Sequence, residues 1–355
     1  MIFTPGPVEV SPGVLQASMK HMNHRSQEFR DIMQSSLHVL RNISDSKRVS
    51  LTTGSGTLAV EMLIWSILSR KEKVIATTYG EFGDRMIESL ERRGCIVYRI
   101  GKEENEIVHP EEVSELASNS GATSIFLVHN ETGNGTQVAN LKEVAGAAKK
   151  SGMKVLVDSV SGFAALPIEL GIWGIDAIAT CGHKGIASVT GIGVNIISDR
   201  LDSSLTKEDT PAYLDLEKSL HFMERDETPF TPSTGAFSAL SEALNELAKE
   251  GIKARIDRTS GFADIMIKRL LEEGYSISGN SDTRSKSVLN ILTRKKSTDV
   301  SSSLRNRGFI VGNGLGKFKE KAIRIGLMGS IKKEDIENLL DEFLRSDQKQ
   351  GRIKD

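Results

Sequence analysis

Short apolar runs alternate with helical patterns between residue 48 and residue 182. Each run is short enough for a buried strand, and most are separated from the next by a segment long enough for a helix. The predicted strands are residues 48–53, 73–78, 95–100, 124–130, 154–160 and 177–182. The predicted helices include residues 58–69, 81–93 and 140–152. This alternation predicts an α/β fold whose mainly parallel sheet is covered by helices on both faces.

The pattern changes after about residue 200. Two long helices are predicted there, at residues 232–251 and 252–274. They are followed by predicted strands at residues 287–293, 308–314 and 322–328, and by a closing helix at residues 332–346. Strands and helices that no longer alternate regularly indicate a second, smaller α+β domain.

The predicted domain organisation therefore has three parts. They are an N-terminal extended arm at residues 1–14, a large domain at residues 15–245 and a small C-terminal domain at residues 246–355. The stretch TPGPVEVSP, residues 4–12, contains three prolines and cannot form a regular helix. A helix is expected near Gly13–Lys20, and the charged tail at residues 347–355 is expected to fray.

Composition narrows the choice of partner. Apolar residues make up 38% of the 355 positions, enough for a sizeable core. The 46 basic and 47 acidic residues give no broad field that would attract nucleic acid or a membrane, so we expect a small-molecule partner. The most apolar helical stretch, residues 62–69, is too short to cross a bilayer. With only two cysteines, Cys95 and Cys181, and no apparent targeting segment, the sequence favours a cytoplasmic protein.

Candidate chemistry lies where predicted strands end. Four such places are residues 54–57, residues 129–132, Asp158 and Lys184. In open α/β sheets, ligands bind beyond the carboxyl ends of the strands, so these places are expected to face one site. Lysine usually lies at the surface, where its ammonium stays hydrated. A lysine at a strand end, in the stretch TCGHKGIASVTGIG, is therefore also a candidate for a reactive group.

The stretch TTGSGTLAVE, residues 52–61, places small residues between a strand and a helix. Glycines let the backbone approach an anion, and a helix N-terminus presents unpaired N–H groups. The stretch is neither a P-loop nor a dinucleotide-binding motif, because the required lysine or later glycine is absent. It predicts a phosphate cradle or, alternatively, an ordinary tight turn with Ser55 or Thr57 as the helix cap.

Asp158 and Lys184 each allow two interpretations. A buried strand-end carboxylate is either a turn or cap residue or the counter-ion of a protonated nitrogen. A strand-end lysine is either a surface residue or, beside a phosphate-bearing aldehyde, the partner in a Schiff base. A phosphate cradle, a strand-end Asp and a strand-end Lys are together what a pyridoxal phosphate site requires.

Nine motifs extend the pattern over nearly the whole chain. They are TPGP at 4–7, NHRSQEF at 23–29, GSGTLAVE at 54–61, YGEFGDR at 79–85, HNETGNG at 129–135, VDSVSGF at 157–163, HKG at 183–185, TPFTP at 228–232 and RIGLMG at 324–329. In this order and spacing, the chain resembles the class V aminotransferases of fold type I, and in particular the alanine–glyoxylate and serine–pyruvate aminotransferases.

The resemblance implies a pyridoxal 5'-phosphate site. Lys184 would hold the cofactor as a Schiff base, and Asp158 would pair with its pyridine nitrogen. Val160 and Phe82 would lie on the two faces of the ring, with Phe82 where relatives commonly have tryptophan. The phosphate would be held by Ser55, Gly56 and Thr57, with His183 as a further contact. His183 departs from the glutamine that relatives commonly have before the lysine, and its charge would depend on pH.

The resemblance also implies the substrate contacts and a partner subunit. Thr132 would lie near the cofactor's phenolic oxygen and the substrate, and Arg324 would bind the substrate carboxylate through its planar fork. Thr228 and Thr231 would reach the phosphate of the partner's cofactor, which implies a homodimer with shared sites. The run ETGNG at residues 131–135 departs from the Ser/Thr-rich run that relatives often have, which leaves local substrate contacts open.

The implied reaction is ping-pong transamination from a small amino acid (alanine, serine or aspartate) to glyoxylate or pyruvate. A fold type I lyase or decarboxylase is the main alternative, since the same cofactor serves other bond cleavages. Cysteine desulfuration is disfavoured because no cysteine follows Cys181 to supply the attacking thiolate. A non-catalytic protein that binds a phosphate ligand through GSGT would leave Asp158, Lys184 and Arg324 unexplained.

Overall fold

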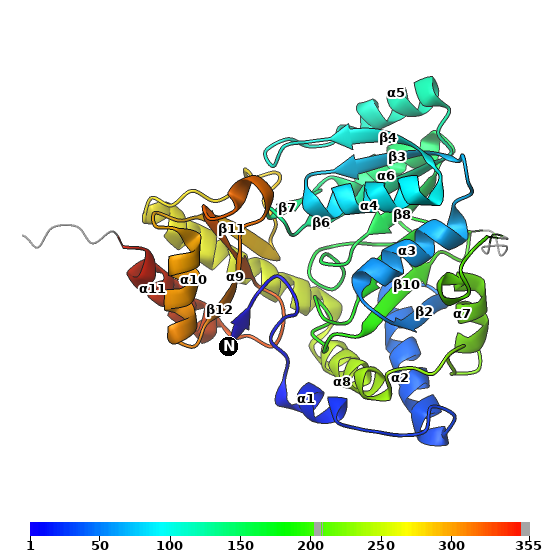
Figure 1. The fold of residues 1–355 in the computed structure, drawn as a ribbon, viewed down its shortest axis with the longest axis horizontal. Coiled ribbons are helices and arrows are strands. Elements are labelled where there is room, and N and C mark those ends of the chain that lie inside the picture. The colour runs from blue at the N-terminus through cyan, green and yellow to red at the C-terminus, as the bar shows by residue number, and fades with distance from the viewer. Residues whose placement is uncertain (202–206, 208, 349–355) are drawn as a thin grey trace, which may run out of the picture.

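A seven-stranded mixed sheet forms the centre of the larger part of the molecule (Figure 1). The computed structural model describes residues 1–201, 207 and 209–348. In order across the sheet the strands are β2 (Arg48–Thr53), β10 (Ile192–Ile197), β9 (Ala177–Cys181), β8 (Lys154–Asp158), β5 (Ser124–Val128), β3 (Lys73–Thr78) and β4 (Ile96–Gly101). Only β10 runs antiparallel to its neighbours, so the predicted α/β fold with a mainly parallel sheet is confirmed.

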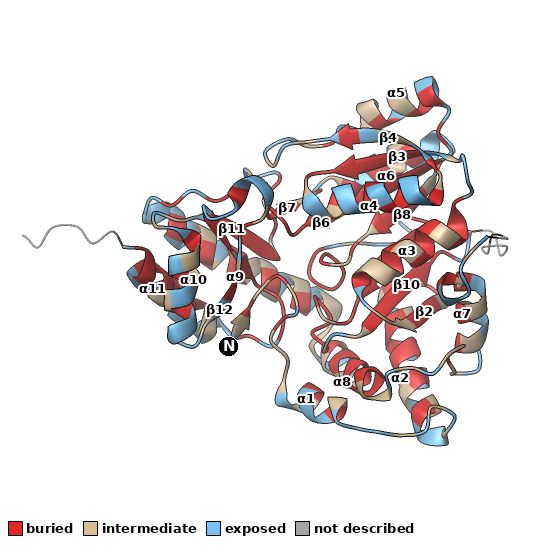
Figure 2. Ribbon diagram, viewed as in Figure 1, coloured by how far each residue is buried: buried red, intermediate tan, exposed pale blue. Residues whose placement is uncertain are grey.

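Helices cover both faces of this sheet, because its strands are apolar on both sides (Figure 2). One face packs against α3 (Gly56–Ile67), α4 (Glu81–Arg93) and α7 (Leu216–Met223). The other packs against α2 (Gln27–Ser44), α5 (Pro110–Ser120), α6 (Leu141–Lys150) and α8 (Thr234–Glu250). Two short strands, β6 (Asn130–Glu131) and β7 (Thr136–Gln137), form a hairpin after β5.

A four-stranded sheet with its own apolar core forms the smaller part. Its strands are β1 (Ile2–Phe3), β12 (Ile310–Asn313), β13 (Ala322–Gly326) and β11 (Val288–Leu292), in that order. Its helices are α9 (Ile252–Glu272), α10 (Ser297–Asn306) and α11 (Lys333–Asp347). The core joins the α9 and α11 side chains Met266 and Phe343 to Phe3, Leu289 and Ile325. Within the described residues, no helix combines the length and apolar character needed to cross a membrane.

The N-terminal segment connects the two parts. Ile2 and Phe3 pair with β12 of the small sheet, and the chain then passes Lys184 before α1 (Pro12–Ser18) begins. The predicted extended arm is therefore extended but also contributes a strand. The boundaries at residues 1–14, 15–245 and 246–355 stay predictions. Most of the tail expected to fray, residues 349–355, lies outside the described residues.

Candidate active site

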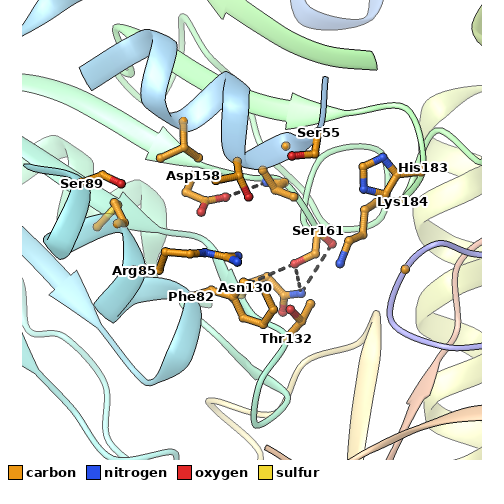
Figure 3. A pocket seen from close by; sticks show the side chains of 16 residues that line it. Ser55, Phe82, Arg85, Ser89, Asn130, Thr132, Asp158, Ser161, His183 and Lys184 are labelled. Carbon is orange, nitrogen blue, oxygen red and sulfur yellow. Dashed lines mark hydrogen bonds between the residues drawn. The ribbon is translucent and has the colours of Figure 1, made fainter. Parts of the chain in front are cut away.

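A cavity lies beyond the carboxyl ends of β8 and β9, against the first turns of α3 and α4 (Figure 3). Residues from the large sheet, its helices and the N-terminal segment line it. They are Gly6, Ser55, Gly56, Thr57, Val60, Phe82, Arg85, Met86, Ser89, Asn130, Thr132, Asp158, Val160, Ser161, His183 and Lys184. Nine of the twelve sequence-predicted site residues are among them, and the exceptions are Thr228, Thr231 and Arg324.

Lys184 follows β9 in a tight turn, and its side chain points into the cavity (Figure 3). It is only 8% exposed. Burial lowers the pKa of its amine, and the positive charges of Arg324 and Arg85 lower it further against the opposing effects of Cys181 and Asp158. Gly6 lies directly against this side chain, since a Cβ at residue 6 would lie 2.4 Å from Lys184 Cε. The N-terminal segment therefore covers the lysine closely.

Asp158 is the last residue of β8 and faces the cavity. The backbone N–H of Val160 donates to its Oδ1 at 2.9 Å. Burial raises the pKa of Asp158 to about 6, although this amide, Lys184 and Arg85 all act to lower it. A carboxylate that is so incompletely neutralised would gain from a cationic group in the cavity.

The first turn of α3 borders the cavity with Ser55, Gly56 and Thr57. The side chain of Ser55, the residue before the helix, makes no capping hydrogen bond. A Cβ at residue 56 would lie 2.6 Å from Val160 Cγ1, so glycine is needed for the close approach of these two segments. Open N–H groups at a helix N-terminus, with free hydroxyls beside them, suit an anion.

Phe82 and Arg85, from α4, both point into the cavity (Figure 3). The guanidinium of Arg85 lies over the Phe82 ring, 4.7 Å from its centroid. Arg324, on β13, donates to the carbonyl oxygens of Thr132 at 3.0 Å and Asn313 at 2.8 Å. Arg324 is thus absent from the lining but is fixed beside Thr132, which does line the cavity.

His183 lines the cavity next to Lys184. Its Nε2 lies 3.6 Å from Cys181 Sγ, whereas its Nδ1 is buried and has no hydrogen-bond partner in the described part of the chain. Burial lowers the pKa of His183 to about 4, and the charge of Lys184 acts in the same direction. The imidazole is therefore neutral at pH 7, and one ring nitrogen remains available to a ligand.

Thr228 and Thr231 lie away from this cavity. With Tyr213 they border a separate small pocket beside the end of β2. Thr228 is buried, and its hydroxyl donates to the carbonyl of Phe230 at 2.9 Å. Within one chain, these two threonines do not contribute to the Lys184 cavity.

Sequence reasoning missed seven lining residues: Gly6, Val60, Arg85, Met86, Ser89, Asn130 and Ser161. A signal for three of them was present. Phe82, Arg85, Met86 and Ser89 are spaced i, i+3, i+4 and i+7, so they share one face of a helix, and Phe82 was already a candidate. The contact of Gly6 had no comparable signal because it joins residues far apart in the chain.

Comparisons with known proteins decide the family. The family model of the class V aminotransferases (Aminotransferase class-V) matches residues 13–339. The chain belongs to the class V aminotransferases. Members of this family depend on pyridoxal 5'-phosphate, so the predicted family, enzyme class and cofactor are all confirmed.

Individual class V relatives match along nearly the full length. A 2-aminoethylphosphonate–pyruvate transaminase of Phocaeicola vulgatus is 28% identical over 355 residues, which cover 96% of this chain and 97% of the relative. Among solved structures, an aspartate aminotransferase of subgroup IV from Thermus thermophilus has a TM-score of 0.90 at 25% identity, covering 97% of this chain and 98% of that one. An alanine–glyoxylate aminotransferase from Nostoc sp. has a TM-score of 0.90 at 26% identity, covering 97% and 94%. The fold type I architecture is confirmed by these neighbours.

Proposed function

We propose that this aminotransferase moves an amino group from a small amino acid (alanine, serine or aspartate) to glyoxylate or pyruvate, with the two substrates bound in turn. The observation that carries the proposal is the convergence of Lys184, Asp158 and the open first turn of α3 on one cavity. The family assignment supports transamination, and the names of relatives support small oxo acids as acceptors. A cytoplasmic location stays a prediction.

The residues of the cavity fit pyridoxal 5'-phosphate. Lys184 would bind its aldehyde carbon. Asp158, which has no cation in hydrogen-bond contact among the described residues, would pair with its ring nitrogen. Phe82 and Val160 would lie against the ring. The phosphate would be held by Ser55, Gly56, Thr57 and the unpartnered Nδ1 of His183. Bound in this way, the cofactor supplies an electron sink for the bond that breaks at the α-carbon of the amino acid.

Lys184 is the group we assign to proton transfer. Only a deprotonated amine can accept the proton from the α-carbon, and burial together with the charges of Arg324 and Arg85 favours that form. The lack of a side chain at Gly6 lets the N-terminal segment pack directly against the lysine, because a Cβ at residue 6 would lie 2.4 Å from Lys184 Cε. Restricting the amine in this way favours transfer to and from one position.

Arg324 is the group we assign to the substrate carboxylate. Two of its N–H groups already donate to Thr132 and Asn313, which fixes the plane of the guanidinium and leaves the others for a ligand. Arg324→Lys would keep the positive charge but lose the planar fork. We expect the KM of the amino acid to rise roughly tenfold or more, with a smaller effect on kcat. An unchanged KM for both alanine and pyruvate would contradict this assignment.

The experiment that tests the proposed function is product analysis with the protein saturated with pyridoxal phosphate. Alanine plus glyoxylate should yield pyruvate and glycine in equal amounts, and omission of glyoxylate should stop pyruvate formation after one equivalent. Continued turnover without an acceptor would instead identify a lyase or decarboxylase. A protein that binds no pyridoxal phosphate would refute the proposal and leave the non-catalytic alternative.

A second amino donor is favoured by a specific observation. The relative from Phocaeicola vulgatus, matched over 97% of its length, is named for 2-aminoethylphosphonate and pyruvate. This donor carries a phosphonate in place of the carboxylate, and guanidinium groups bind both anions. Assays with pyruvate as acceptor and alanine, serine, aspartate or 2-aminoethylphosphonate as donor would rank these donors by kcat/KM.

We further propose a homodimer in which Thr228 and Thr231 reach the cofactor phosphate of the partner. Their position outside the cavity of their own chain supports a role in the partner's site. Chains with Lys184→Ala and chains with Thr228→Val plus Thr231→Val should each have little activity alone. When the two chains are mixed, the hybrid dimer contains one intact site, so activity should return. If mixing restores none, the shared site is refuted.

A further inference from the structure

Glu131 is a buried carboxylate without a salt bridge in the described part of the chain. It belongs to β6, in the hairpin after β5, and is fully shielded from solvent. Its Oε2 accepts hydrogen bonds from the backbone N–H groups of Phe82 and Gly83, each at 3.1 Å, and its Oε1 accepts one from Gly133 at 2.8 Å. Three backbone donors therefore hold one carboxylate, and within the described residues Arg324 acts on it electrostatically without forming a salt bridge.

Two of these donors belong to the first turn of α4. The residue before the helix is Gly80, which has no side chain to cap the helix. Phe82 and Gly83 occupy the second and third helical positions, whose N–H groups an N-cap side chain normally satisfies. Glu131 supplies this cap from another segment, and its negative charge also suits the positive end of the helix.

The third donor, Gly133, ties Glu131 to the loop that carries Thr132. A Cβ at residue 133 would lie 2.8 Å from Glu131 Oε1, so a side chain there would displace the carboxylate from its present position. The carbonyl of Thr132 in turn accepts from Arg324. One carboxylate thus connects the helix that carries Phe82 and Arg85 with the loop that contacts the assigned substrate arginine.

We propose that Glu131 is a positioning residue, which holds the backbone of Phe82 and Gly83 and so sets where the Phe82 ring stands in the cavity. This inference rests on the proposed function, in which Phe82 covers one face of the bound ring. A serine or asparagine cap at residue 80 would be strained, because Gly80 has a φ of 159°, which residues with a side chain rarely adopt. A cap from Glu131 differs because it also fixes the distance between α4 and the Thr132 loop.

The test compares Glu131→Gln with a matched control, Asp84→Asn. Both variants change a carboxylate into an amide at the first turn of α4. Asp84 accepts from the Thr78 hydroxyl and pairs with Arg99, and it does not line the Lys184 cavity. Gly133→Ala is a second variant, which displaces the Glu131 carboxylate without removing it and serves if Glu131→Gln fails to fold.

The first measurement is amide hydrogen exchange in the cofactor-free protein. Burial raises the pKa of Glu131 to about 7, so exchange is measured at pH 8, where the carboxyl is ionised. Glu131→Gln should then speed exchange in the segment 79–86 roughly tenfold or more, since hydrogen bonds to a charged acceptor are among the stronger ones. The second is the circular dichroism that bound pyridoxal phosphate acquires from its surroundings, which should weaken in this variant. The kcat/KM should fall roughly tenfold to a hundredfold, as expected for a misplaced binding surface. Gly133→Ala should change all three in the same direction by less, and Asp84→Asn should leave the cofactor signal and kcat/KM at wild-type values.

Faster exchange together with a weakened cofactor signal in Glu131→Gln supports the proposal. If Glu131→Gln and Asp84→Asn have the same cofactor signal and kcat/KM, Glu131 is only a helix cap and the proposal is overturned, while the proposed function stands. If the wild-type chain itself binds no pyridoxal phosphate, the proposed function fails and the positioning role fails with it. The behaviour of the wild type therefore separates the two failures.

Discussion

Acidic residues have different partners at the two ends of the strands in the large sheet, here called the amino edge and the carboxyl edge. At the amino ends of the strands, Glu72 accepts from Lys154 and Ser124, and Asp176 accepts from both Lys149 and the Val155 amide. At the carboxyl ends, Asp158 accepts only from the Val160 amide among the hydrogen bonds of the described residues. The same fold therefore supplies buried carboxylates with cations at one edge and leaves Asp158 incompletely compensated at the other.

The pKa values of two acids express this difference. Burial alone raises the pKa of Glu72, but hydrogen bonds from Lys154, Ser124 and the Ser69 amide outweigh it and leave the pKa lowered. Burial also raises the pKa of Asp158, and there the opposing groups are too few, so the pKa stays raised at about 6. The amino edge is thus built for stability, and the carboxyl edge retains an electrostatic deficit that a ligand can relieve.

The largest expected effect belongs to Lys184 at the carboxyl edge. Lys184→Ala should lower turnover by about 10³-fold or more, because it removes the amine assigned to cofactor attachment and proton transfer. The stability of the cofactor-free protein should not fall, since the lysine is buried and forms no ion pair with any residue that the structure describes. Borohydride treatment and mass spectrometry measure cofactor attachment, and urea unfolding measures stability. If the variant still attaches the cofactor at a wild-type level, Lys184 is not the attachment site, and the assigned difference between the two edges is refuted.

Asp158→Asn should lower activity by about 10²-fold or more, the scale for removing one partner of a buried ion pair. The same substitution should increase the stability of the cofactor-free protein. The folded pKa of about 6 exceeds the usual 3.8, so the folded state keeps its proton while the unfolded state loses it. Stability therefore falls as the pH rises from about 4 to about 6 and stays lower above that.

Asparagine does not titrate in this pH range, so the fall in stability between about pH 4 and about pH 6 should be absent from the Asp158→Asn variant. Above pH 6 the cofactor-free variant should be more stable than the wild type by on the order of 2 kcal/mol, and near pH 4 the two should be equal. Urea unfolding at pH 5 and pH 8 measures the difference. Equal stabilities at both pH values would mean that Asp158 carries no electrostatic deficit.

Much of this fold could be predicted from local patterns. The strands β2, β3, β4, β5, β8 and β9 and the helix at residues 81–93 follow from runs of apolar residues and from turn signals that act over a few positions. The strand β10 was missed, since its apolar run directly follows the glycine-rich segment after Lys184 and resembles a continuation of that loop. The pairing of Ile2–Phe3 with β12 is also beyond local patterns, because a two-residue strand is specified by its distant partner.

The residues of the candidate site also fall into those that local patterns predict and those that depend on distant segments. Lys184, Asp158 and residues 55–57 were predictable because the ends of parallel strands meet at one edge. Glu131 was inside a predicted motif, but its role depends on amides 48 and 49 positions away, so spacing could not indicate it. The role of Thr228 and Thr231 depends on a second chain and stays a prediction.

Glu72→Gln tests the amino edge and should act on stability alone. The amide keeps the shape of the side chain but loses the charge that Lys154 and the Ser69 amide stabilise. We expect a loss of about 1–2 kcal/mol in the free energy of unfolding at pH 7. Because the pKa of Glu72 is lowered from the usual 4.5, this contribution is complete above about pH 4.5 and is lost as the pH falls through the folded pKa. Turnover with saturating cofactor should stay within about twofold of wild type, and a larger drop would mean that the edges are coupled.

The smallest effect is expected for Lys149→Met at the same edge. Lys149 is 42% exposed and pairs with Asp176, whose side chain is 7% exposed. Solvent screens the charge of the lysine, so its loss should cost less than about 1 kcal/mol, and the cost should shrink further at high salt. Asp176 still accepts from the Val155 amide in this variant, so the carboxylate keeps one partner, as Asp158 does at the other edge. Urea unfolding at low and high salt measures the cost. If the free energy of unfolding falls by several kcal/mol, a single backbone amide does not stabilise a buried carboxylate at this edge. Asp158, which also has one backbone amide as its partner, must then depend on its cavity for stability.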